Sequence, residues 1–195
     1  MALTFPLSHP TTGVSSVEIR TVNAVATSQS PFTYKQQIVS HGGERWEATV
    51  NLAPMRRDTA GAWKAFLAAL RGPTGTFLLG DPTYCNPRGT VSALEVTGNA
   101  GNSSVTVNLT GTLLAGDYIQ LGTGSAARLH QVLEDRIGSG SVEIWPALRS
   151  NYTLSEAIYT SPKGVFRLAS NVSSWSINNA AIYGISFEAV EAITG

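Results

Sequence analysis

The chain is poor in charge. Asp, Glu, Lys and Arg make up 13 % of its 195 residues and the formal net charge is zero, whereas roughly 25 % charged residues is usual in globular domains. A general nucleic-acid-binding protein carries a basic stripe, so this balance argues against that class. Composition leaves two interpretations open: a β-rich domain with a neutral polar surface, or a subunit whose surface is mostly covered in an assembly.

Cysteines and long apolar runs are also scarce. Cys85 is the only cysteine, so an intramolecular disulfide is excluded and a zinc site cannot be built from cysteines. No apolar run approaches the roughly 18 residues that a membrane-spanning helix needs. Residues 1–10 contain neither the basic segment nor the apolar core of a signal peptide. We therefore expect a protein that is made in a reducing cytosol and does not bind membranes.

Recognisable catalytic motifs are missing as well. His9 lies in a Pro-rich leader, His41 precedes a Gly-Gly pair and His130 falls in a predicted strand, and none of them sits in a nucleophile or metal motif. Residues 122–125 lack the third glycine and the helix of a phosphate-binding loop, which indicates a hairpin turn. Cys85 has no nearby base and is better explained as a structural thiol. We expect no enzymatic activity, metal or cofactor, and a cell-wall hydrolase is the disfavoured alternative.

The residues that are present are organised around positions 44–82. Along residues 46–52 apolar side chains alternate with polar ones, which predicts a half-buried strand. Within residues 55–72 the period becomes that of a helix, and its apolar face consists of Ala60, Trp63, Phe66, Leu67 and Leu70. A strand followed by one amphipathic helix predicts a sheet with a single helix packed against it.

Capping and turn residues set the expected limits of that helix. Asp58 or Thr59 can cap its start, and Gly72 followed by Pro73 marks its end. The short apolar run at residues 77–79 lies between turn residues and predicts another strand.

Two further strands are predicted before position 44. Residues 16–26 and 32–40 both alternate, with a turn at 27–31 between them. The sequence His41-Gly42-Gly43 is expected to end the second of these strands. After position 163, residues 165–169 and 174–177 are expected to pair as two strands, and residues 181–193 predict a final strand.

The sequence pattern changes between residues 90 and 163. Short β runs follow one another there, separated by Gly, Ser and Asn turns and without any helix signal; the runs are residues 91–97, 104–109, 117–121, 128–134, 142–145 and 157–159. This spacing is typical of a small barrel or sandwich. We therefore expect a discontinuous domain, residues 1–89 and 164–195, with a compact β domain inserted at 90–163.

Two groups of surface residues are candidate binding sites. The outer side of the helix is basic, which is typical either of a solvated face or of contact with an acidic neighbour; its residues are Arg56, Arg57, Lys64 and Arg71. Aromatic residues of the inserted domain are candidates for stacking on a sugar, although packing is favoured about three to one for the tryptophan; they are Trp145, Tyr152 and Tyr159.

The order of these structural residues resembles the distal tail proteins of long-tailed siphophages. The likeness rests on Ala62-Trp63-x-x-Phe66-Leu67-x-x-Leu70-x-Gly72, on Phe77-x-Leu79-Gly80-Asp81-Pro82 and on Pro87-x-Gly89. Later segments are similar to the inserted module and return strand of related tail proteins; they are residues 114–121, 128–132, 144–149 and 164–168. The likeness covers most of the chain and consists of structural residues rather than a catalytic signature.

The resemblance implies a fold and a role. The fold is mainly β: a β-sandwich with one packed α-helix, plus an inserted small β-barrel of the oligonucleotide/oligosaccharide-binding type. The role is a ring, usually a hexamer, that joins the tail tube to the tail-tip hub and its host-recognition proteins, with the tape-measure protein as a further contact. The expected location is the distal end of the virion tail, after synthesis in the host cytoplasm. The alternative is a carbohydrate-binding adhesion module of the tail tip. Neither role implies specific nucleic-acid binding.

We expect the ring contacts on the basic side of the helix and along the sheet edges at residues 17–39 and 181–193, because an unpaired edge strand invites pairing with a neighbour.

Overall fold

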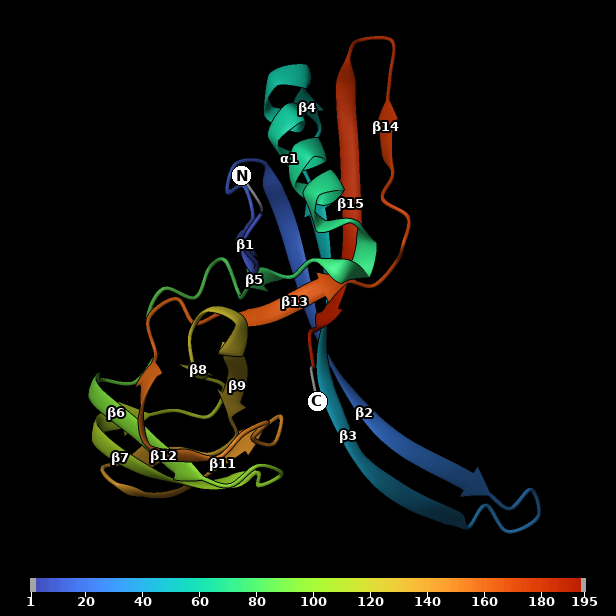
Figure 1. The fold of residues 1–195 in the computed structure, drawn as a ribbon. Helices are drawn as coiled ribbons and strands as arrows, with labels where there is room; N and C mark the ends of the chain where they lie inside the picture. Colours follow the sequence, from blue (N-terminus) through green and yellow to red (C-terminus); the bar gives the residue numbers. More distant parts are fainter. Residues whose placement is uncertain (1–2, 194–195) are drawn as a thin grey trace.

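The computed structural model describes residues 3–193 and contains two β units (Figure 1). The first unit is a sheet that carries the helix α1 (Arg57–Leu70). Its strands are β1 (Leu7–Ser8), β2 (Val14–Gln29), β3 (Gln36–Leu52), β4 (Met55–Arg56), β5 (Phe77–Leu79), β13 (Gly164–Leu168), β14 (Trp175–Ile177) and β15 (Ile182–Glu191). The expected fold class is confirmed: the protein is mainly β, with one α-helix among the described residues and an inserted barrel.

Strand β15 holds the first sheet together. The strand order is β1-β5-β13-β15-β3-β2, and the N-terminal half of β15 also pairs with β4 and β14. The prediction that residues 181–193 form a sheet edge is therefore wrong, because β15 has neighbours on both sides. Strand β2 pairs only with β3, so its outer edge is open, as predicted for this part of the chain.

The helix packs as its period predicts. All five residues of its expected apolar face are buried; they are Ala60, Trp63, Phe66, Leu67 and Leu70. The indole Nε1 of Trp63 donates to the carbonyl of Thr12, 2.8 Å away. The expected cap at Asp58 or Thr59 is wrong: Arg56 is the N-cap and makes no side-chain capping bond, because β4 runs directly into the helix.

The helix ends where the turn residues predict. Arg71 adopts a left-handed conformation, with φ 51°, and its N–H donates to the carbonyl of Ala68. Gly72 follows with φ +66° and lies against Asn171, where an added Cβ would come within 3.2 Å of the Asn171 Cα. A short 3-10 turn, Gly72–Thr74, then leads into β5.

The second unit is a closed barrel, inserted between β5 and β13. Its strands are β6 (Val91–Gly98), β7 (Ser104–Leu113), β8 (Tyr118–Leu121), β9 (Arg128–Val132), β10 (Arg136–Ile137), β11 (Gly140–Trp145) and β12 (Tyr152–Ile158). Six of them close in the order β7-β11-β9-β8-β12-β6, and the short β10 adds to β7. The barrel has one strand more than the five-stranded fold that the resemblance implies. It has a core of its own, centred on Val96, Val107, Ile119 and Ile144.

One predicted strand end is wrong. Residues 36–52 form a single strand, β3, which passes through His41-Gly42-Gly43 without stopping. Asn23 pairs with Glu44 and Val25 pairs with Ser40, so one residue of β2 faces three residues of β3 at this point. Gly42 has φ +69°. The glycines therefore form a bulge inside a long hairpin rather than ending the strand.

The predicted pairing of residues 165–169 with 174–177 is also wrong. Strand β14 pairs with β15 and not with β13. The β14–β15 hairpin is closed by a turn in which Asn178 N–H donates to the carbonyl of Ile182 and Ala181 takes φ 56°. The stretch 170–174 instead interrupts the pairing along one side of β15, between the pair Leu168↔Ala189 of β13 and the pair Trp175↔Ile185 of β14.

The buried face of the helix gives a first test. Leu67 is 1 % exposed, so Leu67→Ala should lower the free energy of unfolding by about 2–5 kcal/mol through lost burial and the cavity left behind. The exposed Ala62 on the same helix is the matched control, and Ala62→Ser should cost only about 0.5 kcal/mol. Urea unfolding followed by tryptophan fluorescence measures both. Equal losses in the two variants would contradict this packing of the helix.

Candidate interaction surfaces

The most exposed part of the first unit is a hairpin arm formed by residues 24–43. It continues β2 and β3 beyond the body of the protein, from the pair Val25↔Ser40 to the pair Gln29↔Gln36 (Figure 1). Every residue of the arm is exposed except Ser30, which is half-buried. A two-stranded hairpin with both faces in water is marginally stable on its own. The arm is therefore the element that would gain most from being covered.

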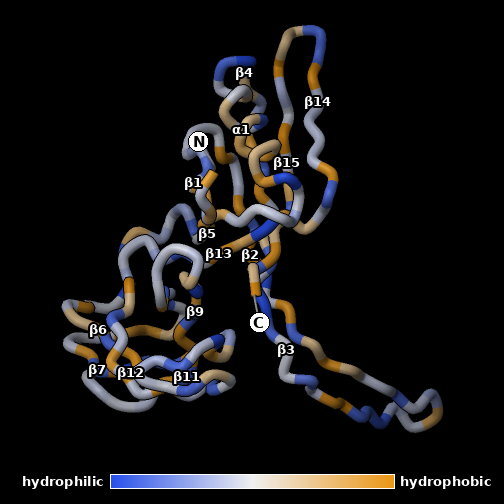
Figure 2. The backbone as a smooth tube through the Cα atoms, viewed as in Figure 1, coloured by the Kyte–Doolittle hydropathy of each residue, from blue (hydrophilic) through white to orange (hydrophobic). Residues whose placement is uncertain are grey.

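Apolar side chains on the arm are left in contact with water. Phe32 is 92 % exposed, Tyr34 74 % and Ile38 62 %, and Val25 and Val39 are close to half exposed. Hydrophobic segments along the arm are visible in Figure 2. A row of exposed apolar and aromatic residues of this kind is typical of protein–protein contacts.

The end of the arm is a compact turn, called the tip below (residues 30–35). The N–H of Tyr34 donates to the carbonyl of Ser30 at 2.9 Å, and the N–H of Ser30 donates to the carbonyl of Lys35 at 3.0 Å. The N–H of Thr33 also donates to the hydroxyl of Ser30. Lys35 is the only Asp, Glu, Lys or Arg residue in the arm. The tip thus presents aromatic side chains and one positive charge on an ordered turn.

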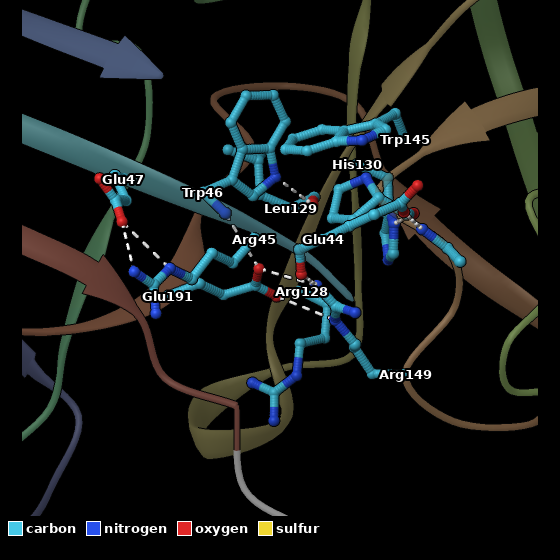
Figure 3. A network of polar contacts seen from close by, with 12 residues as sticks. Glu44, Arg45, Trp46, Glu47, Arg128, Leu129, His130, Trp145, Arg149 and Glu191 are labelled. Atoms are coloured by element: carbon cyan, nitrogen blue, oxygen red, sulfur yellow. Dashed lines mark hydrogen bonds and ion pairs between the residues drawn. The ribbon is translucent and has the colours of Figure 1, made fainter. Parts of the chain in front are cut away.

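The foot of the arm is held by the barrel. At the last pair before the bulge, the indole Nε1 of Trp145 donates to Asn23 Oδ1 at 3.0 Å. The N–H of Ala147 donates to Glu44 Oε2 at 2.7 Å, and the guanidinium of Arg149 donates to the carbonyl of Glu44 (Figure 3). Three residues that follow strand β11 or end it therefore contact both strands of the hairpin where it leaves the sheet.

A buried ion pair reinforces this junction. Arg149 Nη2 lies 3.0 Å from Glu191 Oε2, and the exposed fractions of the two side chains are 17 % and 4 %. Glu191 also accepts the backbone N–H of Trp46 at 3.2 Å. Trp46 packs edge-on against Trp145, with ring centroids 4.4 Å apart, and donates from Nε1 to the carbonyl of Leu129. The first sheet and the barrel thus meet through the buried Trp46 and the partly buried Trp145, beside an ion pair that is largely shielded from water.

His130 lies beneath the same junction and is fully buried. Its Nδ1 is 2.7 Å from the carbonyl of Pro146, and since a carbonyl can only accept, Nδ1 carries the proton. Its Nε2 has no partner within the described residues. Burial lowers the pKa of His130 to about 4, with Arg149 and Arg128 adding to the effect. The ring is therefore neutral at pH 7.

The entry into the barrel is fastened by Asp117, which is fully buried. Its carboxylate accepts the N–H groups of Arg88, Gly89 and Leu114. Nearby, the hydroxyl of Tyr84 accepts the N–H of Tyr118, and burial raises the pKa of Tyr84 to about 12. The Asp117 carboxylate and the Tyr84 hydroxyl thus hold the chain where it enters the barrel, and both are hydrogen-bonded, as polar groups shielded from water usually are.

The predicted basic residues lie along the whole helix. Arg56, Arg57 and Arg71 are exposed at its two ends, and Lys64 is half-buried midway. The ammonium of Lys64 lies 4.6 Å from the ring centroid of Tyr183 on β15. None of the four forms an ion pair within residues 3–193. Their role as an oligomer contact remains a prediction.

The three predicted sugar-stacking aromatics are not gathered on one open face. Trp145 packs between the barrel and the first sheet. Tyr152 and Tyr159 are half-buried against the barrel core, and the hydroxyl of Tyr159 donates to the carbonyl of Ser92. Burial raises the pKa of Tyr152. Each ring thus already has a packing role, which leaves little of it for a sugar.

The sequence predicts ring contacts along residues 17–39, but as the edge of a sheet rather than as an arm that leaves it. The glycine pair predicts a strand end, and the pattern of residues 32–40 is that of an ordinary half-buried strand. A signal is nevertheless present in the composition, because one charged residue among positions 24–43 together with Phe32 and Tyr34 beside a turn is unusual for a solvated hairpin.

Comparisons with known proteins do not add to this picture. No model of a known protein family matches the chain, and no curated protein sequence matches it. Among the residues that the structure describes, no group of three His, Cys, Asp or Glu side chains is placed to hold a metal ion. No helix in this part of the chain is both long and apolar enough to span a membrane.

The ion pair at the foot of the arm can be tested by breaking it. Arg149→Met leaves the carboxylate of Glu191 buried without its partner, which should lower the free energy of unfolding by about 3–5 kcal/mol. The double variant Arg149→Met, Glu191→Gln removes both charges and should recover most of that loss, because the amide oxygen of the introduced glutamine still accepts from Trp46. Chemical denaturation of the three proteins measures this. A single variant as stable as the parent would contradict a structural role for the pair.

The buried histidine makes a second, pH-dependent prediction. The pKa of His130 is about 4 in the folded protein and about 6.5 in the unfolded chain, so the unfolded state binds more protons between these values. Its contribution to stability is complete above pH 6.5 and is lost as the pH falls toward 4, by about 3 kcal/mol in all.

A variant without the titrating group provides the control. His130→Gln keeps a side-chain N–H for the carbonyl of Pro146 and removes the ring. Thermal unfolding of both proteins at several pH values between 4 and 7 should show a shallower loss of stability in the variant. Parallel pH profiles would refute the assignment to His130.

Proposed function

We propose that the protein is a ring-forming structural subunit of a phage tail, located at the distal end where the tail tube meets the tip. The observation that carries the proposal is the hairpin arm, whose apolar residues have no cover within the described chain. When each subunit of a ring places its arm on the next subunit, the arms of all copies are covered. The resemblance to siphophage distal tail proteins supplies the biological setting.

Three properties of the chain support an assembly. The surface is poor in charge and formally neutral, which favours association. The outer edge of β2 is open over a 16-residue strand, so a neighbour can pair with it or pack along it. The foot of the arm is fixed to the barrel by the contacts of Asn23 and Glu44. An arm held in a set direction costs less entropy to dock than a flexible one.

The proposed ring contact is head to tail. The arm of one copy and the surface that receives it on the next are different parts of the chain, so each copy uses both once. A closed rotation then gives a ring, and six copies is the number that the resemblance implies. The tail tube protein and the hub proteins are the proposed neighbours on the two faces of the ring. The work of such a subunit is done by interfaces and requires no catalytic residues.

Mass photometry of the purified protein over a range of concentrations, followed by negative-stain imaging of large species, tests the proposal. We expect closed rings with an open central channel that become more abundant with concentration. Matching Phe32→Ser and Ile38→Ser substitutions on the arm should shift the population toward monomer, because they remove apolar surface from the contact. A parent protein that stays monomeric at every concentration would argue against a self-assembling ring.

A further inference from the structure

We propose that the arm tip of a second copy of this chain binds in a groove beside β2, with Phe32 in an apolar hollow and Lys35 against Asp81. The inference rests on the proposed ring and names the surface that receives the arm. It follows from the shape and lining of the groove, from the unpaired oxygen of Asp81 and from the composition of the tip.

The groove has two connected parts. One is a hollow of about 310 Å³ whose apolar walls include Val14, Val17, Val50, Trp63 and Phe187. The other, of about 620 Å³, continues along the outer edge of β2. The two parts share wall residues from β2 and from the loop that follows β5, among them Val17 and Asp81. The groove therefore lies beside β2, whose outer edge is open.

The size and lining of the hollow suit an aromatic side chain. An apolar cavity of roughly 150 Å³ is enough to bind benzene, and this hollow has about twice that volume. At the tip, Phe32 is the most exposed of the large apolar residues, at 92 %. The hydrogen bonds within residues 30–35 hold its backbone in place before any contact forms.

The charges also match. Asp81 uses Oδ1 to accept the N–H and the hydroxyl of Thr83, at 2.8 and 2.7 Å. Its Oδ2 makes no hydrogen bond within residues 3–193, and Asp81 forms no ion pair there. Lys35 is the only charged residue of the arm. Lys163 also lines the hollow, and its backbone lies against Gly80, next to Asp81.

The tip of the same chain cannot reach this groove. Val17 in the wall and Gln29 at the end of β2 belong to one continuous strand. At roughly 3.3 Å per residue, that strand places the tip about 40 Å from the groove. The foot of the arm is also fixed by Trp145 and Arg149, so the hairpin does not fold back. An arm tip that binds in this groove must therefore come from another copy.

A charge exchange tests the contact. Lys35→Asp and Asp81→Lys should each weaken association about tenfold or more, because each places like charges together. The double variant restores an opposite pair and should return to within about threefold of the parent. Lys163→Asp is the matched charge reversal in the same hollow and should not weaken association, because it removes a positive charge near the site of Lys35. Mass photometry gives the dissociation constants, and circular dichroism checks that each variant is folded.

The outcomes separate the two proposals. Rings that form equally well in both single variants, or a double variant no better than the singles, would overturn the docking site and leave the ring intact. A parent protein that is monomeric at every concentration would overturn both. Weaker association of both single variants, together with near-parental association of the double variant, would establish that Lys35 of one copy contacts Asp81 of another.

Discussion

The structure depends on how β3 is supported after it leaves the sheet. Strand β15 is its neighbour as far as Glu47, which pairs with Val190. Beyond that point the N–H of Trp46 donates to the buried carboxylate of Glu191, and the carbonyl of Glu44 accepts from Arg149. The last side chain of β15 and residues of the barrel thus take over from the backbone of β15 as partners of β3. Because Glu191 is nearly inaccessible to water, leaving its carboxylate without Arg149 would destabilise the strand at this point.

This exchange of partners explains why the arm, which is only marginally stable by itself, has a defined direction. The arm has no core, and its residues between positions 24 and 43 are in water. The order at its foot comes from both units at once: Asn23 and Glu44 are held by the barrel, while β2 and β3 remain paired below them in the first sheet. The apolar surface of the arm is thus held in one direction, which lowers the entropy cost of an intermolecular contact.

Much of the fold could be predicted from local pattern. The helix face of Trp63, Phe66 and Leu67 and the alternation of Trp46 to Leu52 are burial patterns that need only one neighbour to be explained. The bulge at Gly42 could not be told from a strand end, since glycine serves both. The pairing of β14 with β15 was missed because turn residues lie on both sides of β14, and the sequence does not tell which of the two turns closes a hairpin. The junction of Arg149 with Glu191 was invisible because it is non-local: the two residues are 42 positions apart, and neither stands in a motif.

The place where the barrel is inserted has a consequence for how such a chain can change. Strands β5 and β13 pair with each other, and Leu79 lies opposite Gly164 at the insertion point. A short turn would close this gap, so the first sheet has no geometric need for the module between them. A different module could occupy the position in a related protein or in an engineered chimera. To keep the arm in place, however, it would have to bring a cation for Glu191, donors for Asn23 and Glu44, and an acceptor for the buried indole N–H of Trp46. Interchangeability of the module is thus limited by four polar groups on the host sheet rather than by the connecting segments.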